Sequence, residues 1–148
     1  FLKKNNSKII FEPGRSIIGN TAILVSKIIY VKKGYKKDFI ILDSAMNDLI
    51  RPALYNAKHK IIPLKKNKIN SKKSYEFVGP ICESTDKFAT IKKFQKLNEK
   101  EFIAICDVGA YGTSLSSNYN VRPKPLEILI KDSKIQVINK RQKLSELM

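Results

Sequence analysis

The chain has 148 residues, the length of one domain, with 29 Lys and Arg against 13 Asp and Glu and a formal net charge of +16. Its hydrophobic content of 43% is enough for a packed core and excludes a wholly disordered chain, and no apolar run approaches the roughly 18 residues of a membrane-spanning helix. Residues 1–6 contain neither Met nor the apolar stretch of a signal peptide, so we expect a fragment of a longer, soluble protein.

The positive charge has two possible sources, a nucleic-acid surface or a general enrichment in lysine. Of the cationic residues 25 are Lys and only four are Arg, whereas recognition of phosphate and guanine favours the bidentate Arg fork. Lysine enrichment therefore explains the charge without any ligand. A basic nucleic-acid-binding β-barrel stays open as an alternative.

Cysteine and histidine are scarce in this sequence. The two cysteines, Cys82 and Cys106, are too few for a disulfide scaffold and match no zinc spacing. We therefore expect a reducing compartment, the cytoplasm, and no metal site. The only imidazole, His59, stands among lysines, and we expect it at the surface, without a ligand.

Short apolar runs separated by turn residues predict many strands and little helix. The first run, Lys8–Phe11, is expected to be a buried strand that enters a turn at residues 12–15. A helical turn is predicted within 47–55, because Pro52 has the dihedral of a first helical position, and a short helix is predicted at 141–148. The lysine-rich stretch 65–74 is expected to be an exposed loop. Further strands are predicted at 20–30, 37–43, 60–64, 75–78, 101–106, 126–130 and 134–138.

Four polar segments end or interrupt the predicted strands, in positions where loops on a rigid scaffold carry function. They are residues 12–15, 48–55, 79–84 and 109–112, the last followed by 116–120. Each has a plainer interpretation. Gly14 could relieve a turn, Arg51 could pair with Asp48, Tyr111 could be a packed aromatic, and Cys82 could be an inert buried thiol.

In this order the segments resemble the C-terminal portion of the diaminopimelate decarboxylase family, fold-type III enzymes that use pyridoxal 5'-phosphate (PLP). The resemblance covers the chain from Lys8 onward. Ornithine and arginine decarboxylases share the first and third segments in looser form, so a decarboxylase of that type stays open as an alternative. The matching segments are EPGR at 12–15, AMNDLIRPALYNA at 45–57, GPICESTD at 79–86, GAYG at 109–112 and SSNYNVRPKP at 116–125.

The resemblance implies a mainly β fold, with a Greek-key β-barrel or sandwich domain at residues 21–148. Residues 1–20 would be the last strand and turn of a PLP-binding (β/α)₈ barrel that is otherwise absent. The cofactor would be PLP, the substrate meso-2,6-diaminopimelate, and the products L-lysine and CO₂, in the last step of lysine biosynthesis. The resemblance also implies a homodimer with shared active sites, with neither nucleic acid nor membrane as a partner.

Functional residues of the family can be placed on matching positions of this chain. Glu12, Pro13, Gly14 and Arg15 match the turn whose backbone holds the cofactor phosphate, and Tyr111 matches a residue that contacts both phosphate and substrate. The planar fork of an arginine suits a substrate carboxylate. The matching substrate-binding residues are Arg15, Arg51, Tyr55, Glu83 and Tyr111.

The catalytic residue implied by the resemblance is Cys82, the general acid that protonates the carbon left by CO₂. Glu83 beside it matches the acceptor for the distal ammonium of the substrate, and both would act in the partner subunit's active site. The lysine that binds the cofactor covalently lies upstream of EPGR in the family, and none of the 25 lysines here stands in its motif. We therefore expect the chain alone to be inactive. A decaying gene whose fragment has no activity stays open as well.

Overall fold

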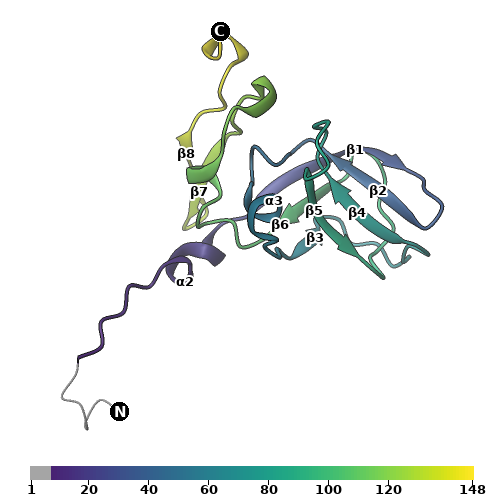
Figure 1. Cartoon of the computed structure of the whole chain (residues 1–148), viewed down its shortest axis with the longest axis horizontal. Coiled ribbons are helices and arrows are strands. Elements are labelled where there is room, and N and C mark those ends of the chain that lie inside the picture. The colour runs from purple at the N-terminus through teal and green to yellow at the C-terminus, as the bar shows by residue number, and fades with distance from the viewer. Residues whose placement is uncertain (1–7) are drawn as a thin grey trace.

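The structure is a computed structural model that describes residues 8–148. Six strands form one mixed sheet in the order β3-β6-β1-β2-β4-β5, and Figure 1 shows that this sheet curls. The prediction of a mainly β domain is thereby confirmed. The strands of the sheet are β1 (Leu24–Lys32), β2 (Lys37–Leu42), β3 (Ile61–Pro63), β4 (Ser74–Val78), β5 (Lys87–Ile91) and β6 (Phe102–Ile105).

The core lies where alternating apolar residues of neighbouring strands meet. In β2 every second residue is buried, including Ile40 and Leu42, as expected for a strand with one face on the core. Leu42 stands opposite Ile28 in the antiparallel pair β1–β2, and Ile40 stands opposite Phe77 in the parallel pair β2–β4. The rings of Phe77 and Phe94 pack edge to face at 5.3 Å. This packing fixes the positions of the strand ends that the polar segments follow.

Helices are short and lie at the connections. α2 (Arg15–Ile18) and α3 (Arg51–Tyr55) are α-helical, and α3 confirms the helical turn predicted around Pro52. No helix in residues 8–148 has the length and apolar character needed to span a membrane. The 3₁₀ turns are η1 (Gly19–Thr21), η2 (Thr113–Leu115), η3 (Tyr119–Val121) and η4 (Leu144–Glu146).

A separate hairpin follows the sheet. β7 (Glu127–Lys131) and β8 (Lys134–Asn139) pair antiparallel with each other and, within the described chain, with no other strand. In Figure 1 this hairpin and the C-terminal residues stand beside the sheet, and the segment before α2 runs away from it in a different direction. Most hairpin side chains are exposed.

Several expectations differ from the structure. The buried strand predicted at Lys8–Phe11 is wrong, because these residues are exposed and pair with no strand of residues 8–148; residues 1–7 of the predicted barrel segment lie outside the described part of the chain. The strand predicted at 20–30 begins only at Leu24, since η1 occupies 19–21. β5 was not expected, and the helix predicted at 141–148 is reduced to η4.

Candidate functional site

The first and fourth polar segments lie side by side. A methyl group on Gly14 would lie 3.8 Å from the hydroxyl oxygen of Tyr111. The amide of Gly109 donates to the carbonyl of Gly19 at 3.0 Å. A Cβ on Gly109 would stand only 2.0 Å from the carbonyl oxygen of Ile18, so glycine is the residue that permits this backbone approach. The turn at 12–15 and the loop at 109–112 thus form one continuous surface.

Tyr111 occupies an unusual backbone conformation within that surface. Its φ of 61° lies in the left-handed region, as does that of Asp107, where residues other than glycine are uncommon. Such conformations cluster at functional sites, where the surroundings hold them in place. Tyr111 is about half exposed, and its hydroxyl borders Gly14.

A cavity of about 400 Å³ joins the other polar segments. We call it the Glu83 cavity, because Glu83 is the charged residue in its wall. Cys82, which immediately precedes Glu83 in the sequence, is exposed. The lining residues come from three segments that are distant in sequence, and they are Met46, Asn47, Ile50, Glu83, Thr85, Ser117 and Tyr119.

Asn47, which is buried, ties two of these segments together. The amide of Ser117 donates to the carbonyl of Asn47 at 2.9 Å, and the Asn47 side chain donates back to the carbonyl of Ser117 at 3.3 Å. Arg122 donates through Nε to Oδ1 of Asn47 at 3.0 Å and lies 4.0 Å from Asp48. The side of the cavity formed by 46–50 is therefore held against 117–122 by paired hydrogen bonds.

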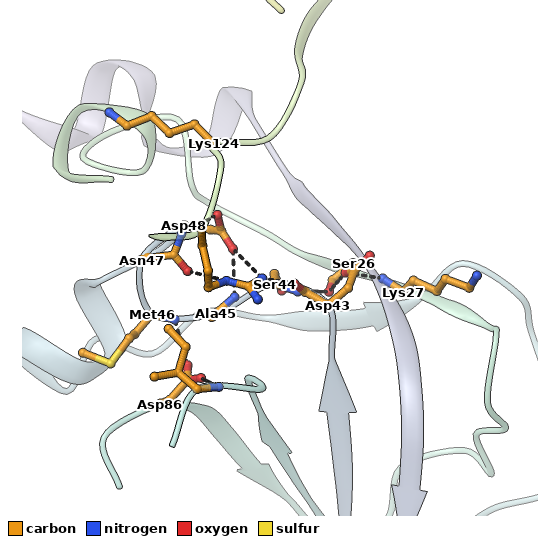
Figure 2. Close-up of polar contacts among 12 residues, drawn as sticks. Ser26, Lys27, Asp43, Ser44, Ala45, Met46, Asn47, Asp48, Asp86 and Lys124 are labelled. Atoms are coloured by element: carbon orange, nitrogen blue, oxygen red, sulfur yellow. Dashed lines mark hydrogen bonds and ion pairs between the residues drawn. The ribbon is translucent and has the colours of Figure 1, made fainter. Parts of the chain in front are cut away.

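Two carboxylates hold the backbone at residues 45 and 46. Figure 2 shows Asp48 and Asp86 on either side of this backbone: Ala45 donates to Asp48 at 2.8 Å and Met46 donates to Asp86 at 2.7 Å. Asp86 also accepts from the amide of Ile81 at 2.9 Å. Asp86 thus joins the segment before α3 to the loop that carries Cys82 and Glu83.

Burial raises the pKa of both carboxyl groups. For Asp48 the amide of Ala45 and the charge of Arg122 oppose the effect of burial without cancelling it. For Asp86 the amides of Ile81 and Met46 and the charge of Arg122 oppose it in the same way, while Glu83 adds to it. Taking a carboxylate out of water costs more here than the hydrogen bonds return.

The helix α3 carries two of the predicted substrate-binding residues. Arg51 begins it and is half-buried, and Tyr55 ends it and is exposed. The alternative pairing of Arg51 with Asp48 is wrong, because Asp48 faces Ala45 and Arg122. Nη1 of Arg51 instead lies 3.3 Å from Nε2 of His59. The surface location expected for His59 is wrong as well, since the residue is only 8% exposed.

The remaining predicted residues stand apart from one another. Glu12, Pro13 and Arg15 are exposed at the start of α2, whereas Arg51 lies on α3. Sequence reasoning missed Asn47, His59, Asp86 and Arg122 as organising residues. Asp86 and Arg122 lie inside motif segments, but no local pattern marks them, because their partners are far away in the sequence. In residues 8–148 no cluster of three or more His, Cys, Asp or Glu is arranged for a metal ion.

Comparison with known proteins identifies the family. Residues 16–109 match the domain described as pyridoxal-dependent decarboxylase, C-terminal sheet domain. The chain belongs to this family. Diaminopimelate decarboxylase from Aquifex aeolicus is 43% identical over 141 residues, which are 95% of this chain and 33% of the relative.

Solved structures of this decarboxylase family agree in fold. The crystal structure of diaminopimelate decarboxylase from Helicobacter pylori, complexed with L-lysine, matches with a TM-score of 0.86 and 44% identity over 99% of this chain and 36% of that one. Lysine/ornithine decarboxylase from Vibrio vulnificus, complexed with cadaverine, matches with a TM-score of 0.64 and 22% identity over 74% of this chain and 30% of that one, which shows the fold alone. The chain spans about a third of the length of the relatives it matches.

Proposed function

We propose that this chain is the C-terminal part of a decarboxylase that converts meso-2,6-diaminopimelate to L-lysine and CO₂ with PLP, the last step of lysine biosynthesis, in the cytoplasm. The observation that carries the proposal is the meeting of the family segments in space. Gly14 lies beside Tyr111, and Glu83 shares a cavity with residues 46–50 and 117–119. The relatives named diaminopimelate decarboxylase support the choice of substrate.

The residues around Gly14 fit the phosphate of PLP. Glycine leaves the backbone exposed there, and the hydroxyl of Tyr111 borders the same space; backbone amides and a phenolic hydroxyl are donors to a phosphate. We assign Glu12, Pro13, Gly14 and Arg15, with Tyr111, to hold the phosphate. When bound, PLP supplies the electron sink for decarboxylation.

The division of the chain follows from this assignment. Residues 1–20 would complete the cofactor-binding barrel, and residues 21–148 would form the sheet domain. Exposure of the apolar side chains Ile10 and Phe11, at 86% and 82%, supports the first part, because such residues are usually covered. The barrel strands that would cover them belong to the upstream two thirds of the relatives. We call this chain joined to that upstream part the complete enzyme.

Two arginines suit a substrate with a carboxylate at each end. We assign Arg15 and Arg51 to these carboxylates, because a guanidinium binds a carboxylate through two parallel hydrogen bonds. Tyr55, at the end of the helix that Arg51 begins, and Tyr111 complete the substrate contacts. Glu83 would accept the distal ammonium, as its place in the cavity wall supports.

We assign Cys82 as the general acid that delivers a proton to the carbon from which CO₂ has left. The thiol is exposed, which supports a role across an interface rather than inside this domain. Cys82 and Glu83 would then serve the active site of a second subunit, so the complete enzyme would be a homodimer with shared sites.

A substrate panel on the complete enzyme tests the proposal. We expect kcat/KM for meso-diaminopimelate to exceed that for ornithine and arginine by at least about 100-fold, since those amino acids leave one of the two assigned arginines without a carboxylate partner. Arg51→Gln should narrow this ratio, and Lys58→Gln, on the exposed surface nearby, serves as the matched control. Faster turnover of ornithine or arginine would identify a decarboxylase of the other type on this scaffold.

A further inference from the structure

The single histidine of the chain is a buried group that the proposed reaction does not use. Nδ1 of His59 lies 2.9 Å from the carbonyl oxygen of Cys106, and Nε2 lies 3.3 Å from Nη1 of Arg51. A carbonyl oxygen only accepts and a guanidinium only donates. Nδ1 therefore donates its hydrogen to Cys106, and Nε2 accepts from Arg51. The neutral ring with the hydrogen on Nδ1 is the form that satisfies both contacts.

The backbone on both sides holds this ring in place. α3 is capped at its C-terminal end by Asn56, whose left-handed φ of 52° reverses the chain. This reversal brings His59 back to the start of the helix, beside Arg51. The amide of Cys106 donates to the carbonyl of Lys60 at 2.8 Å, which fixes the residue after His59 against the end of β6. The imidazole is therefore a rigid support between the sheet and Arg51.

His59 also gives Arg51 a partner that leaves its charge intact. Among the described residues, no carboxylate oxygen lies within 4.0 Å of the Arg51 guanidinium, whereas Arg122 has Asp48 at that distance. An arginine carries five N–H donors, and the imidazole uses one of them. A carboxylate in place of the imidazole would orient the guanidinium equally well, but it would compete with an anionic ligand.

We propose that His59 is a positioning residue that orients Arg51, with its charge uncompensated, toward a carboxylate of the ligand. The identity of that ligand, a dicarboxylic diamino acid, rests on the proposed function. The contact between His59 and Arg51 does not. It follows from the short distances between these groups. It also follows because the Arg51 guanidinium can only donate a hydrogen bond and the Cys106 carbonyl can only accept one.

The tautomer of His59 tests the contact independently of any activity. Because the chain has one histidine, ¹⁵N NMR of the imidazole nitrogens needs no assignment by mutation. We expect the Nδ1–H form, with Nε2 as the unprotonated nitrogen. Arg51→Gln should shift the Nε2 resonance, and Lys58→Gln should not. An Nε2–H ring would overturn the inference, because it could not accept from Arg51.

Kinetics of the complete enzyme test the consequence. His59→Leu removes the acceptor for Arg51. It should raise KM for meso-diaminopimelate about tenfold or more, the effect of losing one hydrogen bond to a charged group. The kcat of the variant should stay within about threefold of the parent value. His59→Gln offers an amide oxygen to Arg51 and should restore most of the affinity. An unchanged KM in His59→Leu, or a loss in kcat alone, would contradict a positioning role.

A double substitution separates positioning from general damage. If His59 acts through Arg51, adding His59→Leu to Arg51→Gln should raise KM no further. Additive increases would show that His59 acts elsewhere and would overturn the inference. Should the parent enzyme fail to decarboxylate meso-diaminopimelate, the proposed function fails, and the NMR result alone decides the contact between the two side chains. If His59→Leu does not fold, His59→Gln and the tautomer of the parent chain still decide it.

Discussion

The thiol of Cys82 stands in an exposed turn next to a carboxylate that lines a cavity, and this placement separates two kinds of cysteine in the chain. Cys106 is half-buried after β6, and its backbone carbonyl accepts from His59. Cys106 therefore acts through its backbone carbonyl, whereas the proposed function of Cys82 depends on its thiol. The two residues give a matched pair of substitutions.

In the complete enzyme, Cys82→Ala should lower kcat by about 10²–10⁴-fold, the usual loss for a general acid, while PLP stays bound. The cofactor is measured by its absorbance and kcat by CO₂ release. Cys106→Ala keeps the carbonyl that His59 needs and should retain most of the turnover. If Cys82→Ala kept full kcat, the proton would have to come from another group.

Sequence reasoning reaches some of these residues and misses others for a physical reason. The motif segments contain Glu83 and Arg51, so their importance can be read without coordinates. His59 cannot be read in this way, because its environment depends on the reversal at Asn56 and on the approach of β6, which comes more than 40 residues later. A buried imidazole and a surface imidazole have the same local sequence.

Among the elements, strand prediction succeeds where both the alternation and a partner strand are present. β2 shows alternating burial and has β1 and β4 beside it. Lys8–Phe11 has the apolar residues of a strand, but no strand of the described chain lies beside it. β5 has the opposite problem, since it contains one large buried side chain, Phe88, and depends on pairing with β4. Composition predicts that a segment can form a strand, and the neighbours decide whether it does.

Asp86 joins the segment before α3 to the loop that carries Cys82 and Glu83, and the loss of its carboxylate should be measurable. Asp86→Asn leaves one oxygen for two amides, Met46 and Ile81, so one buried N–H faces an amide NH₂ group. We expect a loss of about 1–3 kcal/mol in the free energy of unfolding, the cost of an unsatisfied buried donor, measured by urea denaturation at pH 7. Asp132→Asn, in the exposed turn between β7 and β8, is the control.

The difference in the free energy of unfolding between the parent chain and Asp86→Asn should depend on pH in a definite direction. Burial raises the pKa of Asp86 above its ordinary 3.8, so the folded chain binds this proton more tightly than the unfolded chain. The contribution of Asp86 to the free energy of unfolding therefore falls as the pH rises from about 3.8 through the folded-state pKa. The difference between the parent chain and Asp86→Asn should be larger at pH 4 than at pH 7. A difference that grew with pH would mean that the carboxyl pKa is lowered in the folded state.

For the molecule as a whole, the exposed apolar side chains matter more than the net charge. Ile10, Phe11 and the hairpin residues Ile130 and Ile135 are each at least 66% exposed, although the sheet has a complete core of its own. Exposed apolar surface of this kind marks places where further protein packs. This supports the proposal that the sheet domain works as one part of a larger enzyme.

The same reasoning predicts how the isolated chain behaves. It carries the proposed phosphate and substrate contacts, but none of its 25 lysines stands in the family motif that binds the cofactor covalently. Incubated with PLP and meso-diaminopimelate, the purified 148-residue chain should release no CO₂, whereas the complete enzyme under the same conditions should. Because surface lysines react with PLP on their own, absorbance alone does not decide the matter, and CO₂ release is the measurement that does. Turnover by the isolated chain would mean that one of its own lysines serves the cofactor, and the assignment of the upstream barrel to that role would have to be abandoned.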